Sequence, residues 1–194
     1  MGENLDFHLT FRVELKHVAS LLALAERGEA LTKEEISAAA GIPTGKYSGK
    51  VVPHLEYAVY MGLISVDKVD GRFLVSRTRL GSVVFREDAH LLERLSHLMC
   101  HYWLCSESGA QLWYHLWREF IPTVGLSFSE EDFIRSACQR FNRQRVNVTP
   151  LRKCYTSEDS LGKIGILKVH RSNWTVVPHQ YNPQMRYLYA YTLL

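Results

Sequence analysis

The chain has 194 residues, 23 of them lysine or arginine and 20 aspartate or glutamate, which gives a formal net charge of +3. Its hydrophobic fraction of 46% and charged fraction of 22% are ordinary for a globular protein and exclude a disordered tail and a fibrous repeat. Four scattered cysteines are too few for a secreted disulfide scaffold, and neither a secretory signal nor a membrane-spanning stretch is visible. We therefore expect a cytoplasmic protein with reduced thiols.

The first sixty residues carry signals for three helices. Apolar residues at helical spacing predict a helix over 12–26. Thr32, followed three residues later by Glu35, predicts a capping box and a second helix over 33–40. A turn bearing glycine and proline leads to a third helical segment over 46–61, in which Pro53 favours a late start or a kink.

A hairpin follows these helices. The pair Asp70-Gly71 is a hairpin turn signal between strands expected at 63–66 and 73–75. Thr78 is expected to cap a short helix that runs to Phe85. Three helices and a two-stranded hairpin, with a short turn between the second and third helices, are the order of a winged helix-turn-helix.

The second half of the chain is expected to be mostly helical. Asp88 is expected to cap a helix that runs to Cys105, and a second helix over 110–121 is expected to end at Pro122. Further helices are expected over 129–141, from Thr149 as the cap of a Thr-Pro start, and from Asn182 onward; a second hairpin is expected from strands at 164–169 and 174–177.

These elements predict a mainly α fold with small β-hairpins. Residues 1–86 would form a winged helix-turn-helix domain. Residues 87–194 would form a mostly helical domain with a C-terminal hairpin and helix.

Basic residues near the third helix and the hairpin are candidate contacts to DNA phosphates. The helix offers Lys46, Tyr47, Ser48, Lys50 and His54, and the hairpin and its end offer Lys68, Arg72, Arg77 and Arg79. The helix has no Asn, Gln or Arg placed for bidentate base reading, so we expect binding dominated by the DNA backbone. The alternative is that the winged helix is a protein-docking module whose cations only aid solubility.

A second cluster of positive charge lies over residues 135–153, which include six basic residues and no acidic one. Its expected phosphate-contacting members are Arg135, Arg140, Arg143 and Arg145. The alternative is that arginines at the C-terminal end of a helix stabilise the helix dipole, which would explain Arg140 and Arg143 without any phosphate contact. Both interpretations stay open at this point.

Other site chemistries find little support in the sequence. Gly45 and Gly49 enclose three residues and Val51 follows Lys50, so this segment does not fit a nucleotide-binding P-loop. His97 and His101 are four residues apart and could share a metal, with Cys105 one turn further on, but the short paired spacings of a zinc signature are absent. We expect no metal site, no cofactor and no catalytic constellation.

Four stretches together resemble a bacterial family, the domain of unknown function numbered four thousand and seven. They are Phe7-His8-Leu9-Thr10-Phe11, Tyr60-Met61-Gly62-Leu63-Ile64, Ala110-Gln111-Leu112-Trp113-Tyr114 with Glu119-Phe120, and Leu151-Arg152-Lys153-Cys154-Tyr155 with Glu158-Asp159-Ser160-Leu161. The resemblance runs from about residue 7 to the end. It implies an accessory protein encoded beside sulfur-handling enzymes in DNA phosphorothioation and phage-defence operons, with no catalytic residues to carry over.

The expected function is therefore that of a non-enzymatic, winged-helix DNA-binding accessory component of a bacterial DNA-modification or anti-phage defence system, with protein partners from the same operon. One alternative is a protein-interaction or self-associating subunit, suggested by Tyr187, Tyr189 and Tyr191 in the apolar C-terminal helix. Another is a transcriptional regulator, which would require a specific operator sequence.

Overall fold

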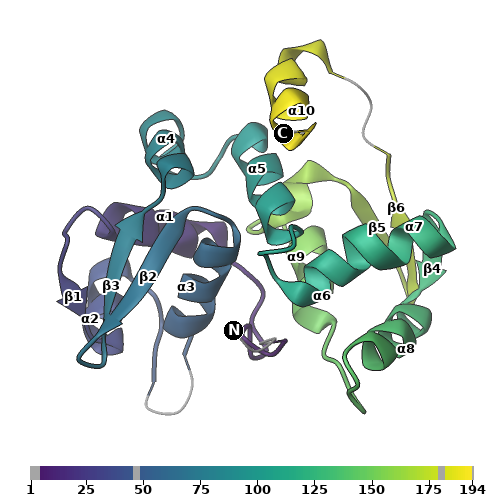
Figure 1. The fold of residues 1–194 in the computed structure, drawn as a ribbon, viewed down its shortest axis with the longest axis horizontal. Helices are drawn as coiled ribbons and strands as arrows, with labels where there is room; N and C mark the ends of the chain where they lie inside the picture. The colour runs from purple at the N-terminus through teal and green to yellow at the C-terminus, as the bar shows by residue number, and fades with distance from the viewer. Residues whose placement is uncertain (1–4, 46–48, 179–181, 194) are drawn as a thin grey trace.

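Two three-stranded antiparallel sheets, each with its own set of helices, make up the described part of the chain, which comprises residues 5–45, 49–178 and 182–193 of this computed structural model (Figure 1). The expected combination of many helices with two hairpins is confirmed. Each hairpin also gains a short third strand. Within the described residues, no helix has the length and apolarity that crossing a bilayer requires.

The first sheet and three helices are formed by the N-terminal half. In chain order they are α1 (Leu15–Leu24), β1 (Ala30–Leu31), α2 (Lys33–Ala40), α3 (Val51–Tyr60), β2 (Ile64–Val69) and β3 (Arg72–Arg77). The capping box is confirmed, because Thr32 accepts from the Glu35 amide while the Glu35 carboxylate accepts from the Thr32 amide. Asp70 and Gly71 have φ values of +49° and +76°, as a tight two-residue hairpin turn requires.

The sheet of this half has the strand order β1-β3-β2. Strand β1 pairs Ala30 with Leu74 and Leu31 with Phe73, and its two residues are too few to leave a periodic signal in the sequence. Helix α4 (Arg79–Glu87) follows β3, and Thr78 caps it by accepting from the Gly81 amide. This short helix is confirmed.

Helix α5 (Arg94–Leu104) starts six residues later than Asp88, where the sequence predicted its cap. The Asp88 carboxylate does accept backbone amides, from Leu92 at 2.9 Å and Glu93 at 2.9 Å, but it closes a turn in which Leu91 has φ of +51°. The prediction was wrong because an aspartate that caps a turn leaves the same local signal as one that caps a helix.

The run after α5 is one helical stretch in three parts: α6 (Gln111–Tyr114), the π-helix η1 (His115–Phe120) and α7 (Ile121–Val124). Pro122 lies in the first turn of α7 and does not end the run, which corrects the expected boundary. A proline inside an α-helix collides with the carbonyl four residues earlier. The wider π turn, closed by the Ile121 amide on the Leu116 carbonyl, gives it room.

The remaining elements build the second sheet and its cover. They are β4 (Ser127–Ser129), α8 (Glu130–Arg140), α9 (Thr149–Thr156), the 3-10 helix η2 (Leu161–Ile164), β5 (Leu167–His170), β6 (Asn173–Val176), the 3-10 helix η3 (Pro183–Met185) and α10 (Arg186–Leu193). The expected hairpin is confirmed as β5–β6, and β4 adds to it through the Phe128–Trp174 pair. The cap of α9 is Val148, one residue before the expected Thr149.

A single hydrophobic core runs through both halves. At the junction the Phe7 ring lies 4.8 Å from Tyr57 and 4.8 Å from Tyr60 of α3, and 5.9 Å from Trp113 of α6, measured between ring centroids. The Leu15 amide also donates to the Asp159 carbonyl at 3.0 Å. Each half has its own sheet, but the two halves share their interior.

Candidate functional site

The sequence predicted its first DNA contacts in a third helix over 46–61, but α3 starts only at Val51. Lys46, Tyr47 and Ser48 lie outside the described residues. On either side of them Thr44 and Gly49 pair as an isolated β-bridge. A Cβ at Gly49 would lie 2.8 Å from the Thr44 Cα, so only glycine fits this approach of two backbones.

Lys50, at the start of α3, is bound to a buried carboxylate. Its ammonium forms a salt bridge with Glu14, whose side chain is only 7% exposed, and Lys16 and His17 lie 3.3 Å and 3.5 Å from the second Glu14 oxygen. Burial would raise the pKa of Glu14, but the Lys50 hydrogen bond and charge outweigh it and lower that pKa to about 2. Lys50 therefore balances an internal charge as well as facing solvent.

His54 does not lie where a DNA contact requires, and this sequence prediction was wrong. The ring is fully buried, its Nε2 accepts the Glu14 amide at 3.0 Å, and its Nδ1 donates to the Lys50 carbonyl at 2.7 Å. Burial lowers its pKa to about 4, so the ring is neutral near pH 7. His54 ties the start of α1 to the start of α3.

Most of α3 is covered by the rest of the molecule. Tyr57 is buried and donates to the Phe11 carbonyl at 3.0 Å, and Trp113 packs against it at 5.8 Å. The helix itself contains no lysine or arginine, and its exposed Val52 and half-buried Glu56 carry no positive charge. The DNA contacts that the sequence predicted for this helix therefore have little support in this geometry.

The basic residues of the hairpin divide into two pairs. Arg72 binds Glu35 at 3.1 Å, and Arg77 binds Glu26 at 3.1 Å while its guanidinium lies 3.6 Å from the Phe85 ring centre. Lys68 and Arg79 are exposed, and neither forms a salt bridge within the described residues, although the Lys68 charge acts on the Glu56 carboxylate. Both side chains are exposed enough to reach a phosphate, although Lys68 also lies 5.7 Å from the Phe73 ring centre.

The second basic cluster is smaller than the sequence suggested. Arg135 binds Glu131 and Asp132 at 3.5 Å and 3.3 Å, and the two nitrogens of Arg140 reach Glu119 at 2.9 Å and 3.3 Å. Arg143 and Arg145, in the segment between α8 and α9, are exposed and have no acidic partner in the part of the chain that is described.

The two histidines of α5 have different partners. His97 is buried against the Leu91 carbonyl at 2.7 Å, whereas the His101 Nδ1 lies 2.8 Å from the Tyr155 hydroxyl and 3.4 Å from the Cys105 sulfur. Among residues 5–45, 49–178 and 182–193, no three His, Cys, Asp or Glu side chains are grouped so that they could hold a metal.

All four thiols are free, with Cys100, Cys105 and Cys154 buried and Cys138 half-buried. Burial raises the pKa of Cys154 to about 11 and of Cys100 to about 12, so these two are protonated near pH 7.

The sequence reasoning missed a cavity between α5, η1, β6 and α10, because its walls come from segments far apart in the chain.

No family model, curated protein or solved structure matches the chain in the comparisons made with known proteins.

Proposed function

We propose that the protein is a non-enzymatic winged-helix component that binds the DNA phosphate backbone in a bacterial DNA-modification or anti-phage defence system. The observation that carries this proposal is the element order α1, β1, α2, α3, β2, β3 with the sheet order β1-β3-β2. A short strand, a helix pair and a hairpin joined in this way are the parts of a winged helix. The defence setting rests on the family resemblance of the sequence alone.

The mode of contact follows from the basic side chains that form no salt bridge with the described residues. Since α3 is largely covered, the proposed contacts lie on loops and on the hairpin, at Lys68, Arg143 and Arg145, together with Lys46 from the sequence. Arg79 is the first residue of α4, on the other side of the molecule, and is left out of this surface. The described ends of the α2–α3 loop and the segment between α8 and α9 lie on the same side of the molecule, opposite α4 and α10 (Figure 1). Such a surface would follow phosphates without reading bases.

The test is a titration of the full chain with duplex DNA at two salt concentrations, comparing the double variant Arg143→Glu/Arg145→Glu with Arg86→Glu on α4. Each lost phosphate contact should flatten the slope of log affinity against log salt by about 0.9, so the double variant should bind more weakly with a slope flatter by about 2. The Arg86 variant should bind like the wild type.

Equal binding by all three proteins would remove the 143–145 segment from the interface, and no binding by the wild type would overturn the proposal. Lys46→Glu tests the α2–α3 loop in the same assay. Lys50 is a poor target, because a glutamate there would face the buried Glu14 carboxylate and unfold the site. Parallel titrations with phosphorothioated duplex show whether the modification is recognised.

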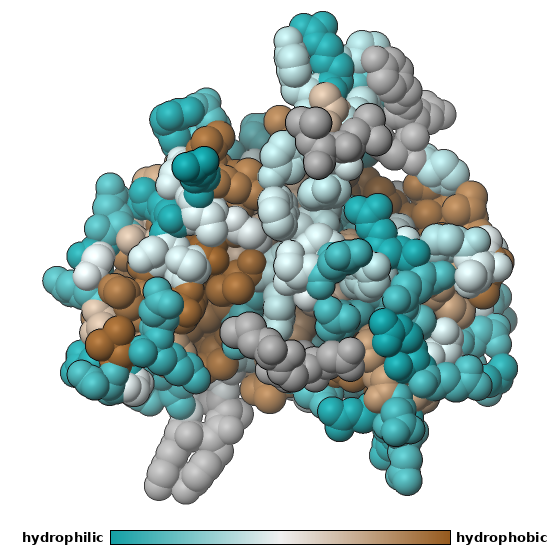
Figure 2. All heavy atoms as spheres, viewed as in Figure 1, coloured by the Kyte–Doolittle hydropathy of each residue, from teal (hydrophilic) through white to brown (hydrophobic). Residues whose placement is uncertain are grey.

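A second candidate, a protein-interaction subunit, is favoured by exposed aliphatic side chains at the start of α5. Leu92 is 66% exposed and Leu95 50% exposed, and Figure 2 shows apolar residues among the polar ones on the molecule's surface. Light scattering of the purified chain tests self-association through this region. A strictly monomeric species up to high concentration counts against self-association as its role.

A further inference from the structure

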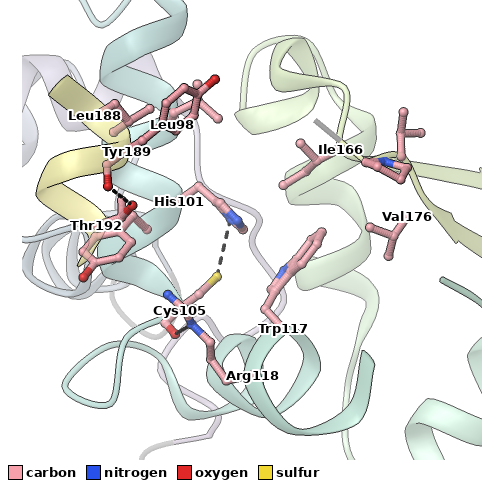
Figure 3. Close-up of a pocket in the computed structure, with 13 residues that line it drawn as sticks. Leu98, His101, Cys105, Trp117, Arg118, Ile166, Val176, Leu188, Tyr189 and Thr192 are labelled. Carbon is pink, nitrogen blue, oxygen red and sulfur yellow. Dashed lines mark hydrogen bonds between the residues drawn. The ribbon is translucent and has the colours of Figure 1, made fainter. Parts of the chain in front are cut away.

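A cavity of about 320 Å³ lies between α5, η1, the end of β6 and α10 (Figure 3). Its walls are mainly apolar side chains from four separate segments. They are Leu98 from α5, Trp117 from η1, Ile166 and Val176 from the second hairpin region, and Leu188 from α10. This volume is at the lower end of the range for small-molecule sites, which are typically apolar with a few polar groups that fix the ligand's orientation.

One polar group at this cavity carries a charge that nothing in the described chain balances. Arg118 is exposed at the cavity wall, where its Nε donates to the Cys105 carbonyl at 3.4 Å and its guanidinium lies 5.7 Å from the Tyr102 ring centre. No carboxylate of the described residues forms a salt bridge with it, whereas Arg140 and Arg152 each hold one. A cation beside an apolar cavity favours a ligand with an anionic head and an apolar body.

The other polar groups of the cavity are neutral. Burial lowers the pKa of His101 to about 3 and raises the pKa of the Cys105 thiol. The His101 Nδ1 and the Cys105 sulfur are 3.4 Å apart, a contact marked by a dashed line in Figure 3. A thiolate–imidazolium pair would be needed for nucleophilic chemistry, and this environment disfavours both charges. The cavity therefore supports ligand binding and not thiol catalysis.

We propose that this cavity binds a small organic acid, whose carboxylate pairs with Arg118 and whose aromatic or aliphatic body lies against Trp117 and Leu188. A planar guanidinium can donate two parallel hydrogen bonds to a carboxylate, and the Trp117 ring offers a flat apolar surface. Because Leu188, Tyr189 and Thr192 of α10 line the cavity, a bound acid would also hold α10 against the rest of the chain. This site is separate from the proposed DNA surface.

The experiment uses titration calorimetry to measure the affinity of the protein for three acids, 4-phenylbutyrate, indole-3-acetate and octanoate. The affinity for each acid is compared with that for the corresponding uncharged amide. The wild type should bind at least one acid more tightly than its amide. Arg118→Gln should lower the affinity for that acid by about tenfold or more, because the hydrogen bonds from the charged guanidinium are lost. The affinity for the amide should stay unchanged. Arg118→Lys should restore part of the affinity, and Arg86→Gln should match the wild type.

A second variant separates charge from shape. Val176→Trp, which fills the cavity, should abolish binding of both acid and amide while circular dichroism stays native. Bound acid should also slow amide hydrogen exchange across α10. Absence of binding by all three acids at millimolar concentration, or equal affinity of acid and amide in wild type and Arg118→Gln, would overturn the proposal.

Discussion

Individual side chains around Glu14 show what a linear sequence hides. Lys50 and His54 were expected to face DNA because they stand at the start of a helix in a basic neighbourhood. The fold instead places Glu14, 36 and 40 residues earlier, between them. Residue types and local spacing reveal charges, but they do not reveal a partner that tertiary packing brings from another helix.

The same limit explains the second basic cluster. The sequence shows six basic residues and no acid in the window 135–153, yet Glu119 of η1 and Glu130 at the start of α8, both before that window, bind Arg140 and Arg152. Arg143 and Arg145 are left as exposed cations because no acidic side chain of the described residues reaches their segment. The set of exposed cations without a salt bridge is therefore smaller than the sequence count suggested.

The buried His54 makes stability depend on pH. In the unfolded chain this ring takes up a proton near its ordinary pKa of 6.5, whereas in the folded chain it does so only near 4. The unfolded state binds more protons between these values, so His54 alone should lower the free energy of unfolding by about 2 kcal/mol between pH 7 and pH 5.

Urea unfolding of His54→Gln at both pH values checks this expectation. The variant should be less stable at pH 7, because hydrogen bonds to Glu14 and Lys50 are lost, but its pH dependence should be weaker than that of the wild type by about the same 2 kcal/mol. His8, His17 and His101, whose pKa values burial also lowers, contribute to the dependence that remains. The exposed His90→Gln should keep the wild-type dependence, and an unchanged dependence in His54→Gln would contradict the argument.

At the level of helices and strands, the sequence predicted best where a cap or turn has one local solution. The Thr32–Glu35 box, the Asp70-Gly71 turn and the Ser129 cap of α8 are all confirmed. The late start of α5 and the π-helix could not be read in this way, because both depend on how the chain packs around them. Short strands such as β1 and β4 exist only through their pairing partners.

The docking of α4 depends on the absence of a side chain. A Cβ on Gly81 would lie 1.8 Å from the Leu63 carbonyl oxygen, which belongs to backbone and cannot turn away. Gly81→Ala should therefore force α4 off the start of β2 and cost about 2 kcal/mol or more in a denaturant titration. The neighbouring Ser82→Ala, on the exposed side of α4, should change stability by about 0.5 kcal/mol or less, and equal effects of the two substitutions would refute this packing.

For the molecule as a whole, the sequence indicated two parts with a boundary after residue 86, and each part does have its own sheet. It could not indicate how closely they join. Phe7, before the first helix, packs between Tyr57 and Trp113, and Arg12 binds Asp159 across the junction. Contacts between residues more than a hundred positions apart leave no local pattern.

The shared core predicts one cooperative unfolding transition. All four tryptophans lie in the C-terminal half, so their fluorescence reports on that half, whereas far-ultraviolet circular dichroism reports on both. The two probes should give the same urea midpoint. Phe7→Ala should destabilise the protein by about 3 kcal/mol and lower both midpoints together. A fluorescence midpoint that stays unchanged in this variant would show that the halves unfold separately.

The placement of the cysteines gives the protein a built-in reporter of its own opening. Only Cys138 is partly exposed; Cys100 and Cys154 are buried in the interior, and the buried Cys105 lines the cavity between α5 and α10. Alkylation followed by mass spectrometry would then add one label quickly and further labels only as fast as the surrounding structure opens. The order in which Cys100, Cys105 and Cys154 acquire mass would rank the local stability of three regions without any substitution.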